Sequence, residues 1–243
     1  MRLSRLTVLV AVAGVVLTGC ANPKDLSPNG GNAPATTAPA DNGIKDLTAA
    51  QIVAKAAAAT DAAGSYRVKG EVSHDGQRVN ADVRIKGKDI SGTVVVTQGT
   101  VKVLRVGTDV YLQADPAVWR IFGGPMAETL GTLFREKWVK TSTANKEWSE
   151  FAAIGDVTQM VKTYGTSTIT KGELKTVNGV NVVELKEASG PSIFVAATGE
   201  PYIVRVEMTG EGHLDVTEFG ASFADIAAPP ANQVVDMSAL LGK

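Results

Sequence analysis

The feature that most constrains this chain is the alternation of apolar and polar residues in short segments separated by tight turns. Five such segments follow one another between residues 66 and 112: 66–72, 79–85, 90–96, 101–106 and 110–112. Alternation with a period of two is typical of a strand with one buried face, and short turns make consecutive strands antiparallel neighbours. The sequence therefore predicts a five-stranded antiparallel meander with one face in water.

A second series of strand-like segments lies in the last third of the chain. It comprises residues 166–170, 174–177, 180–186, 192–196, 202–209 and 213–219. Asn178-Gly179, between two of these segments, is the strongest short-range signal for a hairpin. The tail that follows, residues 227–241, contains Pro229 and Pro230 and is expected to cross the surface or to add an edge strand.

Helices are predicted before and between the two series of strands. Thr48 and Gln51 form a capping-box pattern, and the helix that they open is expected to end at Gly64. Pro125 is suited to open a second helix, and Asp156 to cap another. Because packed domains are built in layers, we predict an α+β fold in which helices cover the concave face of a large, curved antiparallel sheet.

The N-terminus has the pattern of a secretory signal. Arg2 and Arg5 precede an apolar run over residues 6–16, which is shorter than the roughly 20 residues that a membrane-spanning helix needs. The run ends in Leu17-Thr18-Gly19-Cys20, an order that resembles the bacterial lipobox, in which the cysteine thiol is acylated and the chain is cut before it. The alternative is an ordinary signal with a chance cysteine. We expect a protein anchored by Cys20 to the extracytoplasmic face of a membrane.

The remaining chain divides into a linker and one domain. Residues 1–19 are the expected signal peptide, and residues 20–45 carry the lipidated cysteine and a stretch rich in proline, glycine, alanine and asparagine. Such a composition has no apolar periodicity and is typical of a disordered tether. Residues 46–243 are long enough to bury the core of a single domain.

Charge and motifs exclude several classes of function. After removal of the signal with Arg2 and Arg5, 22 of the 24 basic residues remain beside 25 acidic ones, which gives a formal charge of −3. A nucleic-acid-binding protein would be expected to carry a positive charge instead. Acylation of Cys20 uses the single thiol of the chain, so disulfides and thiolate metal sites are excluded. Nucleophile-elbow, phosphate-loop and zinc-protease motifs are missing, and His74 and His213 stand alone. We expect no enzyme, no cofactor and no metal site.

The hairpin turns predict a register with functional meaning. If residues 72 and 79 pair, and residues 85 and 90 pair, then small residues gather on the inward face of three adjoining strands. The candidate lining of an apolar cavity is then Gly70, Ala81, Val83, Gly92 and Val94. The alternative is that the small residues only let the sheet coil or let a helix approach closely.

Three further segments carry a family resemblance. With the lipobox, the tether and the capped helix, the stretches Val110-Tyr111-Leu112, Lys137-Trp138-Val139-Lys140 and Pro201-Tyr202-Ile203-Val204-Arg205-Val206 resemble the LppX/LprG lipoproteins of actinobacteria. That family is similar in fold to the lipoprotein carriers LolA and LolB. The resemblance implies a half-open β-barrel with helices in its mouth.

The same resemblance implies a function. It is the non-covalent binding of an acylated lipid or lipoglycan and its transfer within the cell envelope, with an envelope transporter as a further partner. The alternative is an envelope interaction or sensor module without a lipid ligand. A ligand cavity would favour the carrier, and an apolar surface patch over a dry core would favour the interaction module.

Overall fold

The computed structural model of the chain describes residues 39–74, 76–122, 127–144, 156–163, 169–188 and 190–236. Cys20, the expected signal peptide and most of the expected tether lie outside the described residues. A compact unit begins at Pro39, a few residues before the boundary expected from the sequence. At its start, Ile44 is fully buried, and the Asn42 side chain donates hydrogen bonds to the carbonyl oxygens of Ala196 and Gly199.

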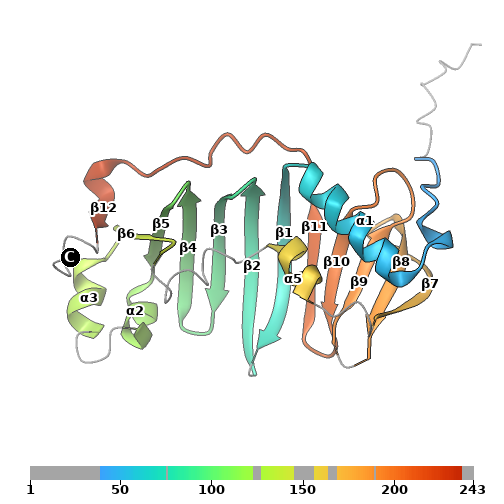
Figure 1. Ribbon diagram of the computed structural model, residues 1–243. Coiled ribbons are helices and arrows are strands. Elements are labelled where there is room, and N and C mark those ends of the chain that lie inside the picture. Colours follow the sequence, from blue (N-terminus) through green and yellow to red (C-terminus); the bar gives the residue numbers. More distant parts are fainter. Residues whose placement is uncertain are drawn as a thin grey trace, which may run out of the picture. The chain divides into compact units, whose positions relative to one another are not determined.

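The unit is built on one twelve-stranded sheet (Figure 1). The strands are β1 Ser65–His74, β2 Gln77–Lys86, β3 Asp89–Val96, β4 Gly99–Val106, β5 Asp109–Ala114, β6 Trp138–Ser142, β7 Ile169–Val177, β8 Val180–Glu187, β9 Ser192–Ala196, β10 Ile203–Met208, β11 Gly212–Thr217 and β12 Val234–Asp236. Their spatial order is β12-β6-β5-β4-β3-β2-β1-β11-β10-β9-β8-β7. Every neighbouring pair is antiparallel except the parallel pair of β12 and β6. The sheet is open, with β12 and β7 at its two ends, which confirms the predicted fold class.

The two series of strands meet at β1. Strand β1, the first of the N-terminal meander, pairs with β11, the last of the C-terminal series, through contacts such as Val68 with Val216 and Gly70 with Leu214. Short connections along the sequence make all the other antiparallel pairs except that of β5 and β6. One long-range pairing therefore merges two locally formed meanders into a continuous sheet.

Four α-helices accompany the sheet in the described part of the chain: α1 Ala49–Ala62, α2 Pro116–Phe122, α3 Ala127–Leu133 and α5 Val157–Thr163. The predicted capping box of α1 is confirmed, because the Thr48 hydroxyl accepts a hydrogen bond from the Gln51 backbone and the Gln51 side chain accepts one from the Thr48 backbone. The side chain of Asp156 accepts the Gln159 backbone N–H at 2.9 Å, as expected for the cap of α5.

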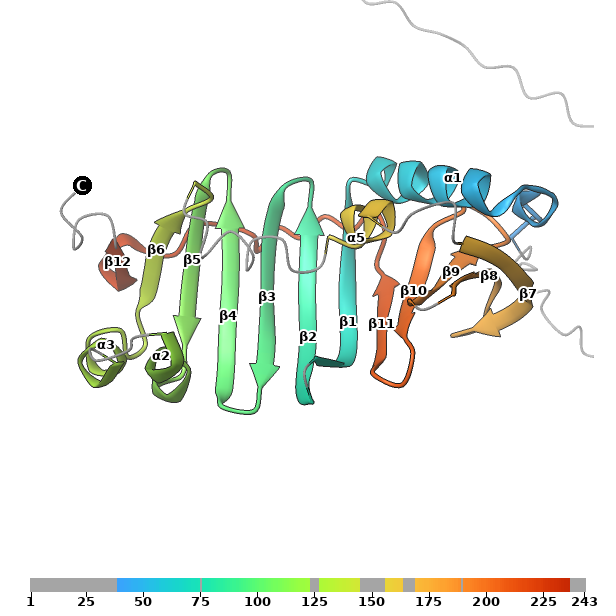
Figure 2. The same ribbon diagram turned by 60° about the horizontal axis from the view of Figure 1, so that its bottom comes forward.

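Helix α1 packs closely on the sheet. Its residues Ile52, Val53 and Ala56 share a cluster with side chains of β8, β9 and β10. The helix contacts both β10 and β7, so the sheet bends around it toward its β7 end (Figure 2). Thr60, fully buried on the same helix, accepts a hydrogen bond from the Ile203 backbone N–H at 3.1 Å and so joins α1 to β10.

The two faces of the sheet have different characters. We call the face under α1 and α5 the helix face; there Val68, Val83 and Ile85 lie in an apolar cluster with Val157 of α5. The residues that alternate with them, among them Arg67 and Asp82, point to the opposite side.

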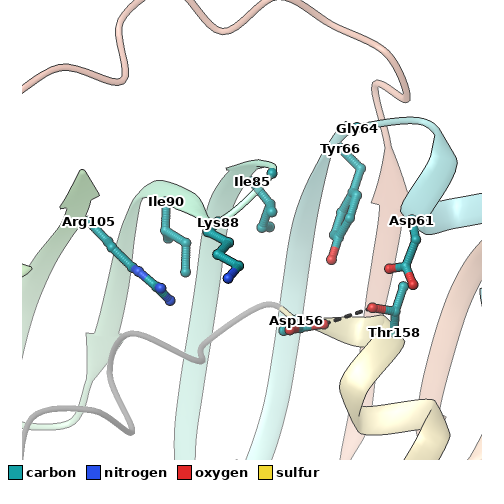
Figure 3. A pocket seen from close by; sticks show the side chains of 10 residues that line it. Asp61, Gly64, Tyr66, Ile85, Lys88, Ile90, Arg105, Asp156 and Thr158 are labelled. Atoms are coloured by element: carbon teal, nitrogen blue, oxygen red, sulfur yellow. Dashed lines mark hydrogen bonds between the residues drawn. The ribbon is translucent and has the colours of Figure 1, made fainter. Parts of the chain in front are cut away.

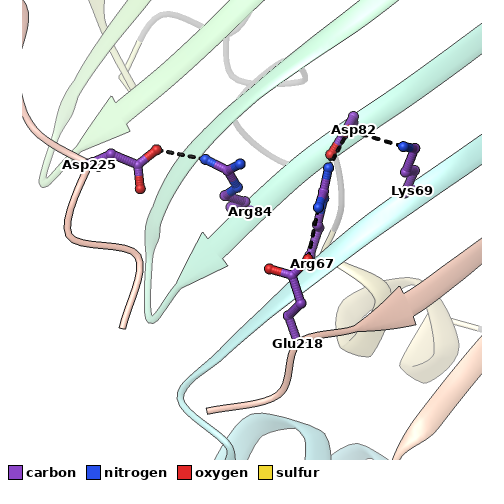
Figure 4. Close-up of polar contacts among 6 residues, drawn as sticks. All are labelled: Arg67, Lys69, Asp82, Arg84, Glu218 and Asp225. Carbon is purple, nitrogen blue, oxygen red and sulfur yellow. Dashed lines mark hydrogen bonds and ion pairs between the residues drawn. The ribbon is translucent and has the colours of Figure 1, made fainter. Parts of the chain in front are cut away.

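A C-terminal segment covers part of that opposite side. Residues 218–236, which we call the strap, run from β11 across the first meander to β12 (Figure 1). Arg67 donates to both oxygens of Asp82 and pairs with Glu218 of the strap, and Arg84 pairs with Asp225 at 2.6 Å (Figure 4). We call this side the strap face. The predicted tail therefore both crosses the surface and adds an edge strand.

The middle of the chain differs in part from expectation. Helix α2 was not predicted; it begins at Pro116, directly after Asp115, whose side chain accepts the Thr100 backbone N–H at 2.8 Å. The helix expected from Pro125 is present as α3, which begins at Ala127, whereas Pro125 itself lies outside the described residues. None of the helices among the described residues is both long enough and apolar enough to cross a membrane.

Candidate functional site

A pocket of about 260 Å³ opens on the helix face where α1 ends and α5 begins. Its walls come from these two helix ends and from β1 to β4 (Figure 3). The described pocket therefore joins residues that are far apart in the sequence, from Asp61 to Thr158.

The apolar side of the pocket is one row of residues across neighbouring strands. Tyr66 pairs with Ile85, Ile85 with Ile90, Ile90 with Arg105, and Arg105 with Val110. Tyr66, Ile85 and Ile90 belong to the apolar cluster under α5. Val110 belongs to a separate cluster under α2. The pocket thus lies at the junction of two hydrophobic clusters, and Arg105 stands between them.

Tyr66 is nearly buried at the α5 end of this row. Burial raises the pKa of its phenol, and the nearby carboxylates of Asp156 and Asp61 raise it further. The phenol is therefore neutral at physiological pH and can act as a hydrogen-bond donor.

The acidic side of the pocket is already satisfied within the protein. Asp61 forms an ion pair with Lys162 of α5 at 2.8 Å. Burial opposes ionisation of Asp61, but hydrogen bonds from Lys162 and Thr158 outweigh it and hold the pKa of this carboxyl below its usual value. Asp156 accepts hydrogen bonds from the Thr158 hydroxyl and the Gln159 backbone, both at 2.9 Å. The Asp61 contacts tie α5 to α1, and the Asp156 contacts cap the start of α5.

The basic side of the pocket has few partners. Lys88 is exposed on the β2–β3 turn, and Arg105 is half-buried on β4. The Arg105 Nε donates to the Gly107 carbonyl oxygen at 3.2 Å. Among the described residues, no carboxylate pairs with either cation.

Two glycines lie at the rim of the pocket. Gly64 at the end of α1 and Gly87 in the β2–β3 turn have positive φ angles of 71° and 59°, a backbone conformation that residues with a side chain rarely adopt. The Gly87 backbone N–H donates to the Gly64 carbonyl oxygen at 2.7 Å, so the helix end and the turn meet there without side chains between them.

The register on which the cavity prediction rests is confirmed. Val72 pairs with Val79, Gly70 with Ala81, Val83 with Gly92, and Ala81 with Val94. Ala81 and Val83 lie in the packed cluster under α5, and Val94 is also buried. The pocket begins one residue pair further along, at Ile85 and Ile90, so none of the five predicted residues lines it.

The two glycines among the predicted residues lie close to neighbouring backbone. A Cβ atom on Gly92 would lie 2.7 Å from the carbonyl oxygen of Asp82, and one on Gly70 would meet the carbonyl oxygen of His213. These contacts support the alternative explanation, in which small residues permit close approach of strands. Their role as part of a ligand cavity stays a prediction.

Gly92 also borders a second hollow, of about 290 Å³, on the strap face. Trp138 also lines it, together with the charged residues Asp82, Arg84 and Lys102. Within the described ranges, His, Cys, Asp and Glu side chains nowhere gather in a group of three that could hold a metal ion.

Sequence reasoning missed the pocket residues Arg105 and Lys88. One signal could have found the first of them: the inward positions of β4 read Val101, Val103 and then Arg105, so a cation replaces the expected apolar residue. Asp156 was predicted, but as a helix cap. Tyr66 was predicted, but as an ordinary inward strand residue.

Comparison with known proteins gives structural likenesses. No family model matches the sequence, and no curated protein matches it. The structure is similar to the crystal structure of LprF from Mycobacterium bovis, with 15% sequence identity, a TM-score of 0.48, and coverage of 75% of this chain and 97% of that one. It is also similar to an uncharacterized conserved protein from Thermus thermophilus, with 8% identity, a TM-score of 0.38, and coverage of 76% and 97%. LprF is the neighbour that corresponds to the predicted resemblance to LppX/LprG lipoproteins.

Proposed function

We propose that this protein is a lipoprotein that is anchored to the extracytoplasmic face of a membrane through Cys20 and binds an acylated lipid or lipoglycan on the helix face of its sheet. In this proposal it carries the ligand within the cell envelope and catalyses no reaction. The tether upstream of the folded unit would let the domain reach roughly tens of ångströms from the membrane surface, which is the distance that a flexible linker of its length spans.

The observation that carries the proposal is the position of the pocket between two hydrophobic clusters. Ile85 and Ile90 lie under it, and Val110 of the neighbouring cluster continues the same row beyond Arg105. An acyl chain that enters the pocket would contact the apolar side chains of Tyr66, Ile85 and Ile90, an environment that favours its transfer from water.

The size of the pocket limits what enters it without rearrangement. Its volume of about 260 Å³ is close to the lower end of the range typical of ligand sites, about 300 to 1,000 Å³. It therefore suits the polar head and the first part of one chain. The rest of a long chain would have to enter between the clusters under α5 and α2, which lie on neighbouring strands, with Ile90 of β3 in one and Val103 of β4 in the other.

Organic extraction of the purified protein tests the proposal. The chain from residue 21 onward, without signal and anchor, is purified without detergent, extracted with chloroform and methanol, and analysed by mass spectrometry. We expect an acylated amphiphile in near-stoichiometric amount. A separate portion of the folded protein, delipidated on a hydrophobic resin without organic solvent, should bind a fluorescent fatty acid. An extract without amphiphile, together with a folded, delipidated protein that fails to bind the fatty acid, would contradict the proposal.

A further inference from the structure

Arg105 occupies an unexpected place for a cation. It lies on the helix face of the sheet, in register with Ile90 on one side and Val110 on the other, both of which are buried. Charged residues on an apolar face are costly unless they are paired or reach water, so such a position needs a reason.

The protein itself supplies little compensation for this charge. Within the described ranges, the hydrogen bond from Arg105 Nε to the Gly107 carbonyl leaves both terminal NH₂ groups of the guanidinium unused. Lys88 lies at the same pocket, and within the described part of the chain it too lacks an ion pair. Figure 3 shows both side chains at the pocket, Arg105 from β4 and Lys88 from the β2–β3 turn.

The acids of the pocket do not neutralise these cations. Asp61 is paired with Lys162, and Asp156 is held by hydrogen bonds at the start of α5. Among the described residues, the charge in the pocket that has no partner is therefore positive, and it lies at the side where Ile85 and Ile90 offer an apolar surface.

We propose that Arg105 and Lys88 bind the anionic headgroup of an amphiphile, a phosphate or a carboxylate, while its apolar part lies against Ile85 and Ile90. This inference rests on the proposed function and names the class of its ligand. The planar guanidinium can donate two parallel hydrogen bonds to such an anion, and the lysine adds a mobile second charge above the glycine rim.

The proposal predicts a preference that can be measured with three probes. Decyl phosphate and decylglycerol share the same chain and differ in headgroup charge, and inorganic phosphate has the charge without the chain. Each is titrated by calorimetry, below its micelle concentration, into the chain from residue 21 onward. We expect decyl phosphate to bind about tenfold or more tightly than decylglycerol, and inorganic phosphate to bind much more weakly than decyl phosphate.

Substitutions identify the residues that cause the preference for decyl phosphate over decylglycerol. Arg105→Gln should remove most of the difference in affinity between decyl phosphate and decylglycerol, and Arg105→Lys should retain more of it. Lys88→Gln should lower it in part. Lys86→Gln is the matched control for Lys88→Gln. Lys86 is also an exposed lysine, two residues before Lys88, but it lies on β2 and points to the strap face. Circular dichroism melts establish that each variant is folded.

The outcomes separate this inference from the proposed function. Equal binding of both decyl probes by the wild type, or an equal loss of both in Arg105→Gln, would overturn the headgroup assignment and leave lipid binding intact. Inorganic phosphate binding as tightly as decyl phosphate would overturn it in favour of a simple anion site. Failure of all three probes to bind would overturn both proposals.

Discussion

A tryptophan in place of Ala81 separates a packed cluster from a ligand cavity. Ala81 is 7% exposed and lies between Gly70 and Val94 in the register, in the same cluster as Val83. The indole of Ala81→Trp would have to displace side chains that already fill this space. We expect the variant to lose about 1 to 3 kcal/mol of unfolding free energy, or more.

The same loss can be read from thermal melting. In a domain of this size a change of 1 kcal/mol shifts the melting temperature by about 2 to 4 °C, so we expect a decrease of at least about 2 °C and up to about 12 °C. Amphiphile binding by the folded fraction should persist, because the pocket begins at Ile85 and Ile90.

The control is Asn80→Trp, on the same strand. Asn80 is exposed and points to the strap face, so its replacement should leave the melting temperature nearly unchanged. If Ala81→Trp melts like Asn80→Trp and no longer binds amphiphile, Ala81 lines a cavity, and the location that we propose for the ligand is wrong.

Further predictions concern the anchor, a buried hydrogen bond and an ion pair. Cys20→Ala should leave the precursor uncleaved and without added acyl mass, as measured by mass spectrometry beside the wild type. Normal processing and acylation of this variant would contradict anchoring through Cys20. Thr60→Val should cost about 1 to 3 kcal/mol in denaturant unfolding, because it strands the buried N–H of Ile203, whereas Thr60→Ser should cost less; equal costs would refute that role of the hydroxyl. Hydrogen bonds from Arg67 hold the pKa of Asp82 below its ordinary value although burial opposes them, so the pair stabilises the fold above about pH 4 and this contribution disappears as the pH falls further. Asp82→Asn should therefore flatten the acid limb of the stability curve, and an unchanged limb in urea titrations would contradict the assignment.

The sequence predicts the local parts of this fold well. Hairpin turns fix the register of β1, β2 and β3, because a slip by one residue would turn every apolar side chain to the other face. The capping box at Thr48 marks the start of α1 in the same local way. Both signals are carried by residues that are close together in the chain.

The parts that the sequence did not predict depend on distant residues. Nothing near β1 specifies that it pairs with β11, although this contact creates the continuous sheet. The pocket likewise combines Asp61 and Thr158 with Arg105, and at its rim the Gly87 backbone N–H donates to the Gly64 carbonyl oxygen. Small residues such as Gly70 were predicted to line a ligand cavity; the close approach of neighbouring backbone at Gly70 favours the alternative, and the cavity role stays a prediction.

The most direct test of the central claim is to map where the chain of an anionic amphiphile lies. A decyl phosphate with a photoreactive diazirine at the end of its chain is bound to the protein, activated by light, and located by peptide mass spectrometry. We predict adducts in the segments around Ile85 and Ile90 that excess decyl phosphate suppresses. Adducts that gather instead at the strap-face hollow beside Trp138, or that excess decyl phosphate does not suppress, would contradict ligand binding on the helix face.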